Sequence, residues 1–432
     1  MRLRFNFKNK FKYPTNEDNP IFFSSYYEKK IVGDFFVEDD VILAKKAKDS
    51  LGKVFHDLKR DVWHQEFDYK KGLIYAKILE LLNMKELTNP IDNMKISFFT
   101  PYPLKACYYY LKGMRDIYFT DLSNASDNVL KALKMFKKLG YVYECAECYM
   151  GLGLIYRICG AGDINYTMLN EALKIFEKIE VYAKVAEVKA YLGIYELQAG
   201  NINNAMEYFD EALKICKKYD FKRTASDIFN WKGVGCFQDN KFDDAEKFFL
   251  KSLACPVIKR DGKVFSYEML ARIYYKTERY DLSLKYVDMG LKIHQKNKNK
   301  QGVSELMYLK AEVFWAKGLE DKCKEILLNL IKDKHSTSLL YYPSNAYSLL
   351  GLICLKNNDF EKAKNLFMQA SDLENAKDRI KGAVIDYNNL AEVSSRLGDK
   401  EEARRYLAIA LDKALEIGDD DLIFYLKNKL NS

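Results

Sequence analysis

The sequence predicts an all-α protein built as a solenoid of stacked helical hairpins, and a forty-residue repeat is the first observation that predicts it. Each unit carries a small residue at one fixed position, here called the marker: Gly113, Gly153, Gly193, Gly233, Ala271, Ala311, Gly351 and Ala391. Only the step from Gly233 to Ala271 departs from forty, at 38 residues. Self-similarity at a fixed period is typical of architectures in which each unit buries its apolar face on the next.

The second observation is that further positions recur at fixed distances after each marker. Twelve residues later stand mostly small residues: Ala125, Asn165, Ala205, Ala245, Ser283, Cys323, Ala363 and Ala403. Four residues after those, every unit is apolar: Val129, Leu169, Phe209, Phe249, Val287, Leu327, Phe367 and Leu407. This spacing is helical and predicts two antiparallel helices per unit that approach closely at the small positions.

Composition, the third observation, excludes several classes of protein. The 432 residues are 48% hydrophobic, which is unlike a disordered chain and too long for one compact core. The 69 basic and 61 acidic residues nearly balance, so the charge does not favour nucleic acid as a partner. Nine cysteines without a disulfide-framework spacing, and no apolar run of about 18 residues, predict a cytoplasmic protein without a membrane span.

The unit from Lys184 to Lys218 shows how one repeat is built. Leu192, Ile194 and Tyr195 lie on a first helix, and Gly200 is expected to end that helix in the left-handed conformation. Residues 201–204 then turn and are expected to supply an N-cap for the second helix. On the second helix Phe209 is expected to fill the space between neighbouring units.

Prolines and apolar spacing divide the chain into four segments. Residues 1–38 form a basic-aromatic extended arm, and residues 39–100 form an N-terminal helical segment with a proline-rich joint. Residues 101–418 hold the eight repeats. Residues 419–432 form a capping helix, which Asp419 to Asp421 are expected to start and whose apolar residues include Ile423, Phe424, Leu426 and Leu430.

These units resemble the tetratricopeptide repeat, most closely in the stretch from Asn389 to Asp419, which contains Leu390-Ala391, Leu397-Gly398-Asp399, Ala403 and Ala410. The forty-residue period resembles the long-repeat subclass of Pins-type adaptors, kinesin light chains and the Rap and MalT regulators. The resemblance covers residues 101 to 432. It implies a right-handed superhelix whose first helices line a concave groove that binds a protein or peptide.

The sequence shows no catalytic, cofactor or metal constellation. His56, His64, His294 and His335 are its only histidines, and Cys145 and Cys148 lack a second pair at zinc-site spacing. Those two cysteines are interpreted as packing residues. The lysine-rich run 296–300 falls between two repeats and is interpreted as a solvated turn rather than a nucleic-acid contact.

The candidate binding residues are assigned by the resemblance to groove-facing positions of the first helices. They are polar, acidic and aromatic: Glu147, Glu187, Asp227, Asn230, Glu268, Arg272, Tyr275, Glu305, Tyr308, Trp315, Asn345 and Asn388. Ile385 occupies the same position as Glu305, and Glu312 the same position as Arg272. Because acids recur at 147, 187, 227 and 305, here called the acidic row, the expected partner is basic or amphipathic.

Three functions fit these observations. The first is a non-catalytic scaffold that binds a partner peptide in its groove. The second is a peptide-responsive regulator resembling the Rap group, which acts on a signalling protein through its N-terminal helices. The third is a fixed subunit of a large assembly. The sequence leaves the partner, the process and the oligomeric state open.

Overall fold

The described residues of the computed structural model are 102–118, 121–256, 258, 260–332, 341–375 and 380–431. The predicted arm of residues 1–38 and the predicted helical segment of residues 39–100 lie outside them. Over the described ranges the regular structure consists of 17 α-helices and no strand, which confirms the all-α prediction. None of these helices is both long enough and apolar enough to cross a bilayer.

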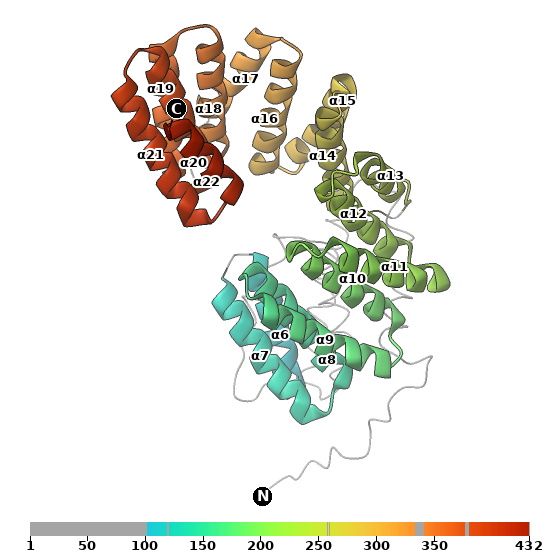
Figure 1. Ribbon diagram of the computed structural model, residues 1–432. Helices are drawn as coiled ribbons and strands as arrows, with labels where there is room; N and C mark the ends of the chain where they lie inside the picture. The colour runs from blue at the N-terminus through green and yellow to red at the C-terminus, as the bar shows by residue number, and fades with distance from the viewer. Residues whose placement is uncertain are drawn as a thin grey trace, which may run out of the picture. The chain divides into compact units, whose positions relative to one another are not determined.

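The helices form hairpins in two compact units (Figure 1). The first unit extends to Gly235 and also includes residues 255–257. Its helices are α6 (Tyr102–Tyr118), α7 (Leu122–Leu139), α8 (Val142–Ile158), α9 (Gly162–Lys178), α10 (Tyr182–Gln198), α11 (Ile202–Tyr219) and most of α12 (Lys222–Gln238). We call the even-numbered helices up to α20 first helices, because each begins a hairpin.

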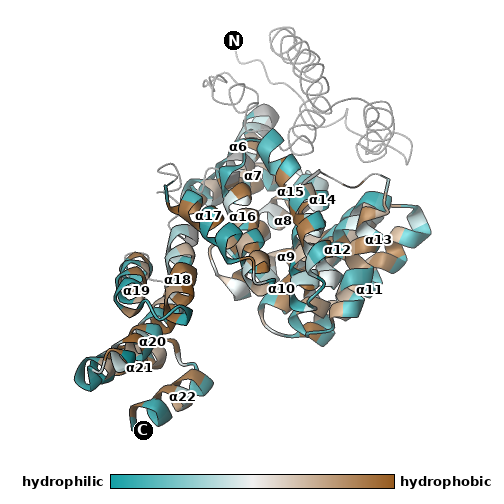
Figure 2. Cartoon of the chain, turned by 90° about the horizontal axis from the view of Figure 1, so that it is seen from above, coloured by the Kyte–Doolittle hydropathy of each residue, from teal (hydrophilic) through white to brown (hydrophobic). Residues whose placement is uncertain are grey.

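The second unit holds the remaining hairpins and a final helix. Its helices are α13 (Phe242–Leu253), α14 (Arg260–Lys276), α15 (Tyr280–Lys296), α16 (Lys300–Ala316), α17 (Glu320–Lys332), α18 (Tyr341–Lys356), α19 (Phe360–Asn375), α20 (Ile380–Arg396), α21 (Lys400–Ile417) and α22 (Asp420–Asn431). Figure 2 shows polar and apolar residues interleaved along the helices, as expected when each helix turns one side inward.

The recurring small residues lie where the two helices of a hairpin approach most closely. A Cβ atom added to Gly193 would lie 2.6 Å from the ring of Phe209, and one added to Gly351 would lie 2.7 Å from the ring of Phe367. Both phenylalanine rings are fully buried. The predicted close approach of the two helices at the small positions is therefore confirmed, and the large residue of the second helix fills the space over the glycine.

The turns follow the prediction in backbone and depart from it in one side chain. Gly200 has φ +82°, the left-handed conformation that ends α10. Asn201 occupies the N-cap of α11 but makes no capping hydrogen bond. Its amide donates instead to Glu196 at 2.9 Å, because the buried carboxylate of Glu196 lies beside the turn. The N-cap residue therefore lies within the predicted stretch 201–204, and only its side chain departs from the usual capping role.

The end of the array is covered as the sequence predicts. The Asp419 carboxylate accepts a hydrogen bond from the backbone N–H of Leu422 at 3.2 Å, so it caps α22. Leu426 is fully buried in a cluster with residues of α20 and α21, whereas Phe424 is 69% exposed. Helix α22 thus seals the last hairpin with one side only.

Candidate partner-binding face

In the first unit, the acids expected to face a partner are engaged within the chain. The Glu147 carboxylate pairs with the Lys184 ammonium at 2.8 Å and accepts hydrogen bonds from Tyr143 at 2.8 Å and Tyr110 at 3.2 Å. Lys184 also pairs with Glu187 at 3.0 Å. Glu147 and Lys184 are only 7% and 5% exposed. A buried carboxylate needs such partners to remain charged, so Glu147 is engaged in contacts within the stack and is not open to a ligand.

The other two candidates of this unit lie on α12. Asn230 is 4% exposed, so its amide is directed into the protein. Asp227 is half-buried. The first unit therefore offers little of the acidic row to a partner.

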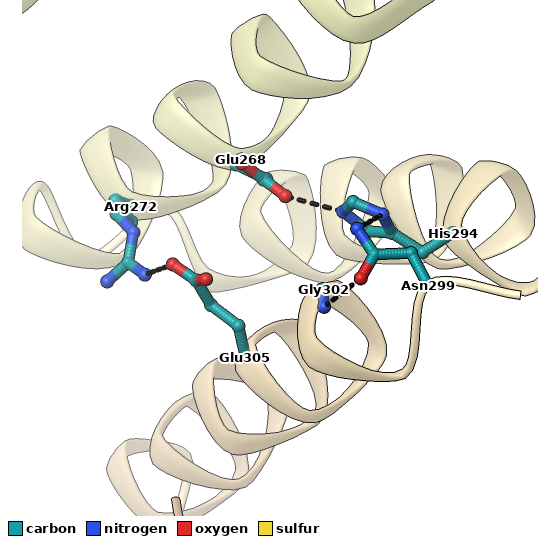
Figure 3. A network of polar contacts seen from close by, with 6 residues as sticks. All are labelled: Glu268, Arg272, His294, Asn299, Gly302 and Glu305. Atoms are coloured by element: carbon teal, nitrogen blue, oxygen red, sulfur yellow. Dashed lines mark hydrogen bonds and ion pairs between the residues drawn. The ribbon is translucent and has the colours of Figure 1, made fainter. Parts of the chain in front are cut away.

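In the second unit a polar network joins α14, α15 and α16 (Figure 3). The Arg272 guanidinium donates to Glu305 at 2.5 Å, and a ring nitrogen of His294 lies 2.6 Å from the Glu268 carboxylate. Burial raises the pKa of Glu268, and the hydrogen bond to His294 opposes that rise. The Asn299 side chain accepts from the backbone N–H of Gly302 at 3.1 Å and caps α16. Three predicted site residues, Glu268, Arg272 and Glu305, thus belong to one network.

The remaining predicted residues of this unit stay partly open. Tyr275, Tyr308, Trp315 and Asn345 are half-buried. The Lys356 ammonium lies 4.5 Å from the Trp315 ring centre and covers part of it. Asn388 is also half-buried, and its side-chain oxygen accepts a hydrogen bond from Lys429 of α22 at 3.0 Å.

Glu312 is a polar residue of this face that the candidate set did not include. It is half-buried and makes no hydrogen bond or ion pair with any other described residue. Burial raises the pKa of Glu312 to about 7, although the cations Arg272 and Lys276 act in the opposite direction. The sequence places Glu312 one residue after a marker, which is a groove-facing position. That position alone does not show whether the carboxylate has a partner.

The two predicted packing cysteines are buried. Cys148 is fully buried and Cys145 is 7% exposed. Burial raises the pKa of the Cys145 thiol to about 11, which keeps it protonated near neutral pH. Within the described ranges no group of three or more metal-ligating side chains is found.

The comparisons with known proteins agree with this geometry. A family model described as tetratricopeptide repeat matches residues 192–219 and 344–377. A search of the curated proteins by sequence finds no match. Two segments of the chain thus match the tetratricopeptide repeat, and the stacked hairpins with small residues at their close approaches have the fold that such repeats build.

Solved structures show the same fold at low sequence identity. The apo quorum sensor NprR from B. thuringiensis is 15% identical with a TM-score of 0.57, covering 85% of this chain and 99% of its own. A Rap protein complexed with competence and sporulation factor is 15% identical, with a TM-score of 0.54 and coverage of 88% and 99%. Aspartyl phosphate phosphatase F from Bacillus subtilis is 16% identical, with a TM-score of 0.52 and coverage of 84% and 96%. The chain thus shares the stacked-hairpin fold of these three structures.

Proposed function

We propose that this chain is a non-catalytic scaffold that binds a segment of a partner protein along the first helices of its second unit. The observation that carries the proposal is a set of large side chains left half-buried there: Tyr275, Tyr308 and Trp315. These side chains pack on the buried apolar clusters around Ala271 and Ala311 and keep part of their surface exposed. Aromatic side chains with one face still open are the anchors that protein partners use most.

We favour the second unit as the binding region because fewer of its polar side chains are paired within the chain than in the first unit. In the first unit Lys184 neutralises both Glu147 and Glu187. In the second unit Glu312 and Asn345 make no hydrogen bond or ion pair with other described residues. A partner can therefore gain hydrogen bonds in the second unit without breaking an internal ion pair.

This pattern also determines which variants test the proposal. Reversing Glu187 or Glu305 to lysine would place two cations together, beside Lys184 or Arg272. Such a change destabilises the stack, so a loss of binding would not show that the substituted residue contacts the partner. Truncating Tyr275 and Trp315 to alanine removes contact surface without creating a buried charge.

The experiment compares proteins that co-purify with the intact tagged chain, identified by mass spectrometry, with those that co-purify with Tyr275→Ala/Trp315→Ala. The matched control is Leu130→Ala/Ile409→Ala, which truncates residues on the second helices α7 and α21 that are 43% and 38% exposed. We expect a partner that the first variant loses and the control retains, with equal helical circular dichroism. A partner retained equally by both variants would contradict the proposal.

The regulator hypothesis depends on residues 39–100, which lie outside the described residues. Its support is the chain layout, a predicted helical segment ahead of the repeats. Loss of a phosphoryl group from a receiver domain on addition of the chain would favour it over a scaffold. The fixed-subunit hypothesis predicts instead that the chain is insoluble when it is expressed alone.

A further inference from the structure

Consecutive first helices of the second unit meet at residues that are 33 positions apart. Arg272 of α14 and Glu305 of α16 form the contact that establishes this register. The same spacing relates Glu312 to Asn345, which we call the polar junction, and Leu352 to Ile385, which we call the apolar junction. The hydrogen bond from Ser348 to Asp386, which are 38 positions apart, shows that α18 and α20 also meet, within about one turn of Leu352 and Ile385.

Charged side chains of the chain pair with one another at the junction before the polar junction and at the junction after the apolar junction. Arg272 and Glu305 form an ion pair at 2.5 Å before the polar junction. After the apolar junction, Glu392 pairs with Arg396 at 3.0 Å and with Lys429 at 3.9 Å. The ends of this stretch of the first-helix face therefore have little to offer a ligand.

The polar junction is open. Glu312 and Asn345 are half-buried, and neither makes a hydrogen bond or ion pair with another described residue. A partly desolvated carboxylate without a donor is unfavourable, and a cation or N–H group brought by a ligand removes that penalty. An amide side chain such as Asn345 can both donate to and accept from a peptide backbone.

The apolar junction is also open. Leu352 is 38% exposed and Ile385 is 53% exposed, although both lie on helices whose other side is buried. Charged residues would keep this surface solvated, as Arg272 and Glu305 do at the equivalent positions. Two aliphatic residues at one junction instead form a surface that gains from being covered.

We propose that the polar and apolar junctions together form one subsite for a peptide that carries a basic residue and an apolar residue about three positions apart. Adjacent helices in contact are about 10 Å apart, and an extended chain rises about 3.3 Å per residue, which gives this spacing. The basic residue pairs with Glu312 and the apolar residue covers Leu352 and Ile385. This inference rests on the proposed function and specifies the chemistry of the partner.

Pairing of a basic residue with Glu312 would also link binding to pH. A cation beside Glu312 favours its ionised form, so binding releases a proton and weakens as the pH falls below about 7. The other groups that interact electrostatically with Glu312 are Arg272, Lys276, Tyr275 and Cys323. Burial raises the pKa values of Tyr275 and Cys323, so both stay protonated near neutral pH.

The experiment selects peptides of about twelve residues from a random displayed library on the intact wild-type chain at pH 8. Affinities of the enriched peptides, made synthetically with a fluorescent label, are then measured by anisotropy at pH 8 and pH 6. The chains compared are wild type, Glu312→Gln, Leu352→Ser/Ile385→Ser, Tyr275→Ala/Trp315→Ala and the control Ile409→Ser, which lies on α21 and is 38% exposed in wild type. Circular dichroism checks that all five are equally helical.

We expect enriched peptides with Lys or Arg about three positions from an apolar residue. Leu352→Ser/Ile385→Ser should weaken binding roughly tenfold or more, and the control should leave it unchanged. Glu312→Gln should weaken binding at pH 8 and abolish the difference between pH 8 and pH 6. A purely structural effect of this variant would leave that difference in place.

Three results would overturn the inference. Peptides whose affinity is unchanged by both subsite variants but is lost in Tyr275→Ala/Trp315→Ala would contradict the subsite while supporting the proposed function. The absence of any enriched peptide would contradict both. Enrichment of acidic peptides would exclude the pairing with Glu312.

Discussion

At the scale of single residues, the second unit contains a pair of acids buried between α18, α19 and α20. Asp386 is 2% exposed and Glu374 is 3% exposed, and they are hydrogen-bonded by the hydroxyl groups of Ser348 and Ser344. Burial raises the pKa of Asp386 to about 7, the Ser348 hydrogen bond opposes the rise, and the Glu374 carboxylate adds to it. Because the pKa of Asp386 is higher in the folded than in the unfolded state, the protein is more stable at low pH, where the carboxyl is neutral in both states. This part of the free energy of unfolding is lost as the pH rises from about 4 to 7.

We therefore predict that Asp386→Asn stabilises the protein at pH 8 and not at pH 4. The asparagine oxygen can still accept from Ser348 while the buried charge is gone, so the free energy of unfolding at pH 8 should rise by about 2 kcal/mol. Urea unfolding at both pH values measures this. Ser395→Ala, at an exposed position of the same helix, is the control. Equal effects of Asp386→Asn at the two pH values would show that Asp386 is not the titrating group.

At the scale of helices, the close approach of the hairpin pair depends on its glycine. The Cβ of an alanine at position 193 would lie 2.6 Å from the fully buried ring of Phe209, which has no free space into which to turn. We predict that Gly193→Ala lowers the free energy of unfolding by about 1–3 kcal/mol. Thermal unfolding followed by circular dichroism measures it.

The matched control is another helical glycine, Gly162 at the start of α9. Its nearest neighbour would be Tyr195 at 3.4 Å, an ordinary contact, so Gly162→Ala should be neutral or slightly stabilising. If both variants destabilised the protein equally, the close approach to Phe209 would not be the cause, and helix propensity would not explain the loss either, because alanine favours a helix over glycine.

At the scale of the whole molecule, each hairpin packs mainly on its neighbours in sequence. Stability in such arrays is a sum of repeat and nearest-neighbour terms, so damage should stay local. Phe209 and Phe367 are equivalent, fully buried residues of the first and second units.

We predict that Phe209→Ala and Phe367→Ala each lower stability by about 3–5 kcal/mol and lower amide protection in different places. Hydrogen exchange should speed up in α10 and α11 in the first variant and in α18 and α19 in the second. Helices of the other unit should keep their wild-type protection in each case. A uniform loss across the chain would show that the two units unfold together.

The sequence by itself determined the hairpin, the close approaches and the capping helix, because every unit repeats the same packing. Gly193, Gly351, Phe209 and Phe367 lie at recurring positions and perform the same role in each. Because the pattern recurs in every unit, it can be recognised from the sequence alone.

Only the tertiary structure decided which polar residues of the first helices are open. Glu147 meets Lys184, and Arg272 meets Glu305, across different repeats, while Glu312 meets no cation at hydrogen-bonding distance among the described residues. Each of these contacts occurs at a single junction, so the period does not encode it. A charge is compensated or left unpaired according to which side chains the stacking brings within a few ångströms and how much water it removes.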